Sequence, residues 1–168
     1  MTQAAPPIWL LTPARAVHLA RPRLLAILNI TPDSFADGGL HFDAGRAVAA
    51  GLRMVADGAD ILDIGGESTR PGATRVDEAE ELRRVIPVVR GLAAEGVTVS
   101  VDTMRASVAE QSLAAGAALV NDVSGGLADD GMAKLVADAG VPWVLMHWRG
   151  HSREMYAAAR YGDVVTEV

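Results

Sequence analysis

The sequence predicts an α/β protein of the parallel (β/α)8 TIM-barrel type, with only about the first five strands present. An alanine-rich helical stretch that ends at a glycine and leads into a short apolar run occurs four times, at Gly58, Gly96, Gly116 and Gly140. The apolar runs are hydrophobic on both faces, as strands covered by helices are. Each run ends in polar residues, which is typical of the edge where a barrel carries its site.

The elements follow in order along the chain. Segment Ile8 to Leu19 is β-like and is expected to form a hairpin that plugs the bottom of the barrel. Strands are expected at residues 24–29, 61–64, 97–101, 118–121 and 141–146, and helices near 43–57, 77–94, 105–115 and 129–139. Asp43 and Asp77 are the expected N-caps of the first two helices, and another helix begins within residues 161–168. We therefore divide the chain into an N-terminal extension, residues 1–23, and a partial barrel, residues 24–168.

The same alternation of strands and helices also fits an open doubly wound sheet. The Gly-x-Gly-x-x-Gly turn that binds dinucleotides is absent after the first strand, which counts against that version. Polar residues at every strand end favour the barrel, because a barrel site draws on many strands. A whole barrel takes about 250 residues, so about three strands are expected to be missing from this sequence.

Composition excludes several classes of function. The 168 residues carry a formal net charge of −6, which argues against nonspecific binding to nucleic acid or to an anionic membrane. There is no cysteine, so thiol catalysis and cysteine metal sites are excluded. The N-terminus lacks the charge pattern of a secretory signal, and no apolar run reaches the roughly 18 residues of a membrane span. We expect a cytoplasmic protein.

Polar side chains at the strand ends are the first candidates for a site. Asparagine and aspartate offer carbonyl-type acceptors, which suit a heterocycle with ring N–H and amino groups. Two of the aspartates lie close to glycine pairs and have the alternative role of fixing loop backbone. The histidine after the last strand is expected to pack and hydrogen-bond rather than act as a base. The set is Asn29, Asp63, Asp102, Asn121, Asp122 and His147, with Asp63 and Asp122 as the two with a structural alternative.

Two polar loops follow the first two strands. The first, which contains Phe35 and Asp37, could close on a ligand or help to hold Mg²⁺ through oxygen ligands; the alternative is a solvated loop. The second places Arg70 in a run with glycines and hydroxyl groups. An arginine there suits phosphate or carboxylate because its planar fork binds two oxygens. For Arg75 a surface salt bridge is favoured.

Together these runs resemble the dihydropteroate synthases, folate-pathway enzymes that sulfonamides inhibit. The resemblance covers almost everything from about Leu24 onward. It rests on segments 28–35, 37–39, 63–73, 100–103, 121–126 and 145–147, of which the first and third are the most specific.

The resemblance implies a transferase that condenses 6-hydroxymethyl-7,8-dihydropterin diphosphate with p-aminobenzoate, giving 7,8-dihydropteroate and diphosphate, with Mg²⁺ as cofactor. It implies catalytic roles for Asp102 and Arg70, and metal binding by Asn29 and Asp37. The residues that it places against the two small-molecule substrates are Asn29, Phe35, Thr69, Arg70, Pro71, Asp102, Asn121 and Met146.

The sequence departs from the family pattern mainly in extent. The family continues with an aspartate on strand six, a Ser-Arg-Lys loop, an Arg-x-His end and the late helices of a homodimer interface. We therefore expect a 168-residue polypeptide to be inactive alone and marginally stable or associated. Ala36 also replaces a serine. The alternatives are an inactive pterin-binding relative and a pterin-binding methyltransferase domain. Intact loops at Phe35 and at Thr69–Pro71 favour the synthase.

Overall fold

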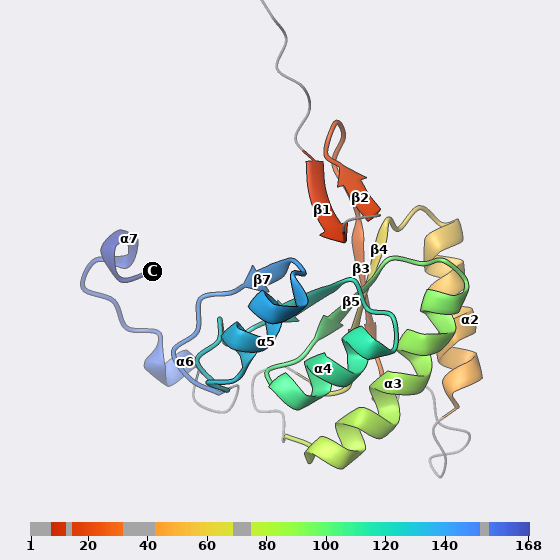
Figure 1. Ribbon diagram of the computed structural model, residues 1–168. Coiled ribbons are helices and arrows are strands. Elements are labelled where there is room, and N and C mark those ends of the chain that lie inside the picture. Colours follow the sequence, from red (N-terminus) through yellow and green to blue (C-terminus); the bar gives the residue numbers. More distant parts are fainter. Residues whose placement is uncertain (1–7, 13–14, 32–42, 69–74, 152–154) are drawn as a thin grey trace, which may run out of the picture.

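The computed structural model describes residues 8–12, 15–31, 43–68, 75–151 and 155–168. Strands and helices alternate after an initial pair of strands (Figure 1). The strands are β1 Ile8–Thr12, β2 Arg15–His18, β3 Leu25–Asn29, β4 Ile61–Gly65, β5 Val99–Asp102, β6 Leu119–Asp122 and β7 Trp143–Leu145. The helices are α2 Ala44–Ala56, α3 Glu78–Ala94, α4 Ala106–Ala114, α5 Met132–Ala139, α6 Met155–Ala158 and α7 Val164–Glu167.

The main sheet is parallel and its strands lie in the order β3-β4-β5-β6-β7. The spatial order is the chain order, without the reversal that defines a doubly wound sheet. Residues of one sheet face pack with residues of the helices into a single apolar core, which includes Leu28, Leu62, Val88, Leu92 and Val120. This arrangement is a section of a (β/α)8 barrel, and it confirms the predicted fold class.

Local chemistry sets the helix boundaries as predicted. Asp43 and Asp77 are N-caps whose side chains accept hydrogen bonds from Arg46 N and Glu80 N. At the other end of α5, Gly140 adopts φ 63°, a left-handed conformation that glycine reaches without strain, and the chain turns there into the next strand. The glycines of the repeated helix–glycine–strand unit, Gly58, Gly96, Gly116 and Gly140, all have positive φ and lie between a helix and the next strand.

Some boundaries differ from the prediction. The strand predicted from Val97 begins at Val99, because Val97 N bonds back to Leu92 O and closes the end of α3. The last strand begins at Trp143 rather than Val141, since Pro142 has no N–H to give to the sheet. The polar stretch after residue 148 contains the short helix α6, which the sequence did not indicate.

The two N-terminal strands form the predicted hairpin. β1 and β2 pair antiparallel, and Val17 packs against a cluster of Ile61, Ala118 and Leu119, near the amino ends of the barrel strands. Arg21, Arg23 and the backbone N–H of Leu24 all donate to Asp60, which fixes the link between hairpin and barrel. The hairpin therefore lies at the end of the sheet opposite to the polar strand ends. The division of the chain at residue 23 stays a prediction.

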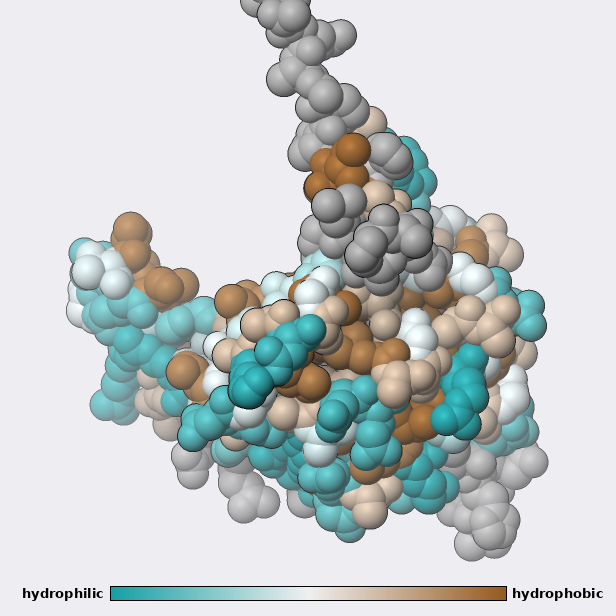
Figure 2. Space-filling view, in the orientation of Figure 1, coloured by the Kyte–Doolittle hydropathy of each residue, from teal (hydrophilic) through white to brown (hydrophobic). Residues whose placement is uncertain are grey.

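Within the part of the chain that the structure describes, β3 and β7 are the edges of the main sheet. Ile27 on β3 is 60% exposed and Leu145 on β7 is 57% exposed, so large apolar side chains lie open at both edges. Figure 2 also shows hydrophobic side chains at α7, where Val164 and Val165 are exposed, as is Val168 directly after the helix. No helix among the described residues is long and apolar enough to cross a membrane.

Candidate active site

Three of the predicted site residues meet at the carboxyl ends of the strands. Asn29 pairs in register with Gly65, Gly65 with Asp102, and Asp102 with Asn121. A Cβ placed on Gly65 would lie 3.3 Å from Asn29 Oδ1 and 3.4 Å from Asp102 Oδ2. The two side chains therefore converge over a position where only glycine leaves the space open. This row of acceptor groups is the floor of the candidate site.

Asp63 lies one layer below this floor and is only 2% exposed. Asn121 Nδ2 donates to Asp63 Oδ2 at 2.8 Å, which fixes the end of the amide that faces the sheet. Burial raises the pKa of Asp63. Asp63 thus orients Asn121, which is a predicted ligand-binding residue. The hydrogen bond of its side chain is to Asn121 and not to loop backbone, which was the structural alternative.

The carboxyl group of Asp102 has a raised pKa. Burial, and then repulsion from the carboxylates of Asp63, Glu81, Asp122 and Glu67, raises the pKa of Asp102 to about 7. In the protein without ligand its carboxyl group therefore changes protonation near neutral pH. A ligand that donates N–H groups to the Asp102 carboxylate would stabilise its ionised form and lower its pKa again.

Asp122 has the structural role that the sequence left open. It is fully buried, and its Oδ1 accepts from Ser124 N and Ser124 Oγ while its Oδ2 accepts from Gly126 N. These bonds fold the glycine-rich loop after β6 back onto the strand end. Gly125, in that loop, approaches Met146 O so closely that a Cβ would lie 2.7 Å from it. The loops after β6 and β7 are therefore in direct contact.

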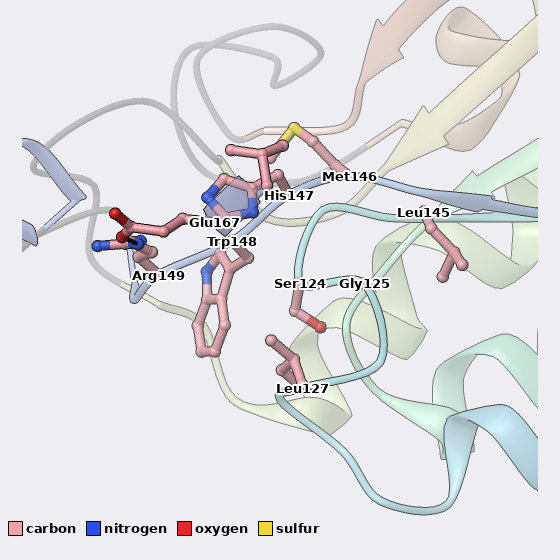
Figure 3. Close-up of a pocket in the computed structure, with 10 residues that line it drawn as sticks. Ser124, Gly125, Leu127, Leu145, Met146, His147, Trp148, Arg149 and Glu167 are labelled. Atoms are coloured by element: carbon pink, nitrogen blue, oxygen red, sulfur yellow. Dashed lines mark hydrogen bonds and ion pairs between the residues drawn. The ribbon is translucent and has the colours of Figure 1, made fainter. Parts of the chain in front are cut away.

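The residues after β7 border a second hollow, an open pocket of about 600 Å³ (Figure 3). Met146 is 47% exposed and lines it together with Ser124 and Leu127 from the loop after β6. His147 is exposed, and its Nε2 lies 2.9 Å from Tyr161 Oη in a hydrogen bond. Among the described residues, Met146 is the predicted substrate-binding residue that lines this pocket.

The remaining predicted residues lie outside the described part of the chain, so their roles stay predictions: Phe35, Asp37, Thr69, Arg70 and Pro71. Arg75, which is described, forms an ion pair with Glu67 at 2.9 Å, in line with the salt bridge favoured for it. Among the described residues, no group of three or more His, Asp or Glu side chains could hold a metal ion.

An ion-pair cluster behind Asp102 was not anticipated. It consists of Glu67, Glu81 and Arg105, with Glu67 8% and Glu81 1% exposed. The sequence did hold a signal for it. Glu81 shares the apolar stripe of α3 with Val85, Val88 and Leu92, and a carboxylate at such a position requires a buried partner.

Comparisons with known proteins agree with this geometry. The family model described as Pterin binding enzyme matches residues 25–168, and the chain belongs to this family. The dihydropteroate synthase of Mycobacterium leprae is 59% identical over 153 residues, which are 90% of this chain and 54% of that protein. The dihydropteroate synthase of Escherichia coli strain K12 is 44% identical over 154 residues, 91% of this chain and 54% of that protein. The chain thus spans about half the length of the curated relatives it matches.

Solved structures show the same relationship. A Xanthomonas albilineans dihydropteroate synthase with 4-aminobenzoic acid superposes with a TM-score of 0.80 at 51% identity, over 91% of this chain and 54% of that one. The same enzyme in complex with 7,8-dihydropteroate gives 0.76 at 46% identity, over 92% and 53%. A Yersinia pestis dihydropteroate synthase in complex with a sulfonamide drug gives 0.82 at 44% identity, over 92% and 56%.

Proposed function

We propose that the protein to which this chain belongs is a dihydropteroate synthase, which joins 6-hydroxymethyl-7,8-dihydropterin diphosphate to p-aminobenzoate and releases diphosphate. The observation that carries the proposal is the floor of the site, where Asn29, Asp102 and Asn121 converge at the carboxyl ends of three parallel strands. The relatives named dihydropteroate synthase, and the ligands in their structures, support it.

The pterin ring lies on this floor in the proposal. Asp102 accepts from ring N–H and amino groups, and Asn121, oriented by Asp63, gives a second acceptor. When the bond between the pterin methylene carbon and the diphosphate oxygen breaks, positive charge develops on the pterin. The Asp102 carboxylate stabilises that charge electrostatically. The neutral amine of p-aminobenzoate then attacks the methylene carbon, a C–N bond forms, and the amine loses a proton to water.

The two loops that follow β3 and β4 are proposed to bind the diphosphate group and p-aminobenzoate. Arg70, outside the described residues, is proposed to bind the diphosphate, while Phe35, Thr69 and Pro71 form the p-aminobenzoate pocket. Met146 is proposed to form part of the wall of the substrate site. These assignments rest on the family resemblance of the sequence.

Mg²⁺ is the proposed cofactor, held by Asn29 and Asp37. The donor type fits, because Mg²⁺ prefers oxygen ligands and is commonly bound by one or two protein groups together with substrate phosphates. Asn29 Oδ1 points toward the open position over Gly65, where such an ion would be in reach of a substrate. When bound, Mg²⁺ would neutralise diphosphate charge. By the same resemblance we propose that the protein is a cytoplasmic homodimer.

The test is product formation by the protein expressed from its whole gene. Purified protein is incubated with the pterin diphosphate, p-aminobenzoate and Mg²⁺, and 7,8-dihydropteroate is measured by liquid chromatography and mass spectrometry. We expect product from the native protein and at least about a hundredfold less from Asp102→Asn, the scale on which loss of one preorganised electrostatic group acts. Pterin binding without product would contradict the proposal and identify a binding-only relative.

A further inference from the structure

Arg105 joins three segments of the chain immediately behind the floor of the site. It follows Asp102 by three residues, at the start of α4. Its Nη1 donates to Glu67 Oε2 at 2.9 Å and also to Glu81 Oε2, and its Nη2 donates to Val76 O at 2.7 Å. One guanidinium therefore contacts the segment that follows β4, the helix α3 and the residues that lead into α3.

Both of its carboxylate partners are buried and fully engaged. Glu81 Oε1 accepts from Thr103 Oγ1 at 2.7 Å, and Thr103 Oγ1 accepts from the backbone N–H of Arg105 at 3.2 Å. Glu67 Oε1 accepts from Arg75 Nε at 2.9 Å. A buried carboxylate without such a partner would be strongly destabilising, so the guanidinium sets where both carboxylates lie.

The position of this cluster ties it to the proposed reaction. A cavity of about 10 Å³ is bordered by Glu67, Glu81, Asp102 and Thr103, so the cluster lies directly behind the floor carboxylate. Glu67 and Val76, which we call the neck, flank the sequence that contains Thr69, Arg70 and Pro71. Arg105 contacts both residues of the neck and sits on the loop that follows Asp102.

We propose that Arg105 is a positioning residue that fixes the neck relative to Asp102, and thereby aligns the second substrate with the pterin. The inference rests on the proposed function, because the alignment matters only if two substrates meet here. The planar fork of arginine is essential to it, since lysine supplies the charge at one point and cannot span Glu67 and Val76 together. Misplacing a reactant by about 1 Å can cost on the order of a hundredfold in rate.

The experiment compares Arg105→Gln and Arg105→Lys in the whole protein. Arg83→Gln is the matched control, because Arg83 is an exposed arginine of α3, the helix that Arg105 contacts through Glu81, and it pairs with Glu80. We expect both Arg105 variants to lower kcat/KM for p-aminobenzoate by roughly ten- to a hundredfold, with pterin affinity, measured well above pH 7, unchanged. Arg83→Gln should match the native protein.

Three outcomes would overturn the inference. Full rescue by Arg105→Lys would show that only charge matters, and equal losses for both substrates would show a general structural role. Hydrogen exchange at Ser68 and Val76 gives a readout that does not need activity: exchange should be faster in both Arg105 variants, with the strand amides unchanged. Unaltered exchange would also overturn the inference. A native protein that forms no dihydropteroate would refute the proposed function, while the exchange result would still decide whether Arg105 holds the neck. If Arg105→Gln does not fold, Arg105→Lys carries both measurements.

Discussion

Replacing Asp102 by asparagine should stabilise the folded protein while it lowers product formation at least about a hundredfold. The substitution keeps the shape of the side chain and removes its titration. In the folded protein the pKa of Asp102 rises from its ordinary value of 3.8 to about 7, first through burial and then through the neighbouring carboxylates, of which Asp63 contributes most. Ionising this group therefore costs free energy that the unfolded chain does not have to supply.

The sign and size follow from proton binding. Between pH 4 and pH 7 the folded state binds a proton at Asp102 that the unfolded state has lost, so the free energy of unfolding of the native protein falls as pH rises through this range. Each pH unit corresponds to about 1.4 kcal/mol, which sets a ceiling of about 4 kcal/mol. Because the charge of Asp63 contributes to this shift and the pKa of Asp63 is itself raised, we expect about 2–4 kcal/mol in favour of Asp102→Asn above pH 7, and little difference near pH 4.

Urea unfolding of both proteins from pH 5 to pH 8.5 measures this difference. The advantage of the variant should grow with pH and then level off above about pH 7. Asp138→Asn is the control, because Asp138 is exposed and pairs with Lys134 at the surface, so the difference in stability between this variant and the native protein should not change with pH. A constant difference for Asp102→Asn across the range, or a loss of stability throughout, would refute the assignment of the titrating group.

Three further predictions concern the floor and the loops. Asn121→Leu removes the donor to buried Asp63, and urea unfolding should show a loss of about 1–3 kcal/mol above pH 7, where an unchanged stability would contradict the contact. Gly125→Ala should cost at least about 2 kcal/mol by the same assay, because φ is 63° and the new Cβ would press on Met146 O; a neutral result would mean that the loops separate freely. Changes at Phe35, Thr69 or Pro71 should alter sulfonamide inhibition more than pterin affinity measured by calorimetry, and equal effects would argue that these loops only support the fold.

Sequence periodicity predicted the barrel section well because each unit is local. A helix, its glycine and the following strand lie within a few tens of residues, and the N-caps Asp43 and Asp77 depend only on the first turn of their own helices. The floor could be predicted for a related reason. Parallel strands of one barrel end at one edge, so polar residues at strand ends must meet there, as Asn29, Asp102 and Asn121 do.

The partners of the buried charges could not be predicted in the same way. Arg105 meets Glu67 across 38 residues of sequence and Glu81 across 24, and only the relative placement of α3 and the two strand ends decides these pairings. The partner of the Asp63 side chain was also decided by tertiary structure. Its neighbouring glycines suggested a loop anchor, yet its position on β4 turns it toward Asn121, and the anchor is Asp122 instead.

The charges around Asp102 destabilise its ionised form, and the proposed reaction depends on this. Several carboxylates lie around Asp102, and Arg105, which lies beside them, forms ion pairs with Glu67 and Glu81 rather than with Asp102. The ionised form of Asp102 thus lacks a cationic partner within the cluster, and burial makes its solvation poor. A planar ligand that donates N–H groups stabilises the ionised form of Asp102. A ligand on which positive charge develops stabilises it more. A fixed lysine or arginine on the floor would make the fold more stable, but it would remove the difference in affinity between ground state and cation on which the proposed reaction depends.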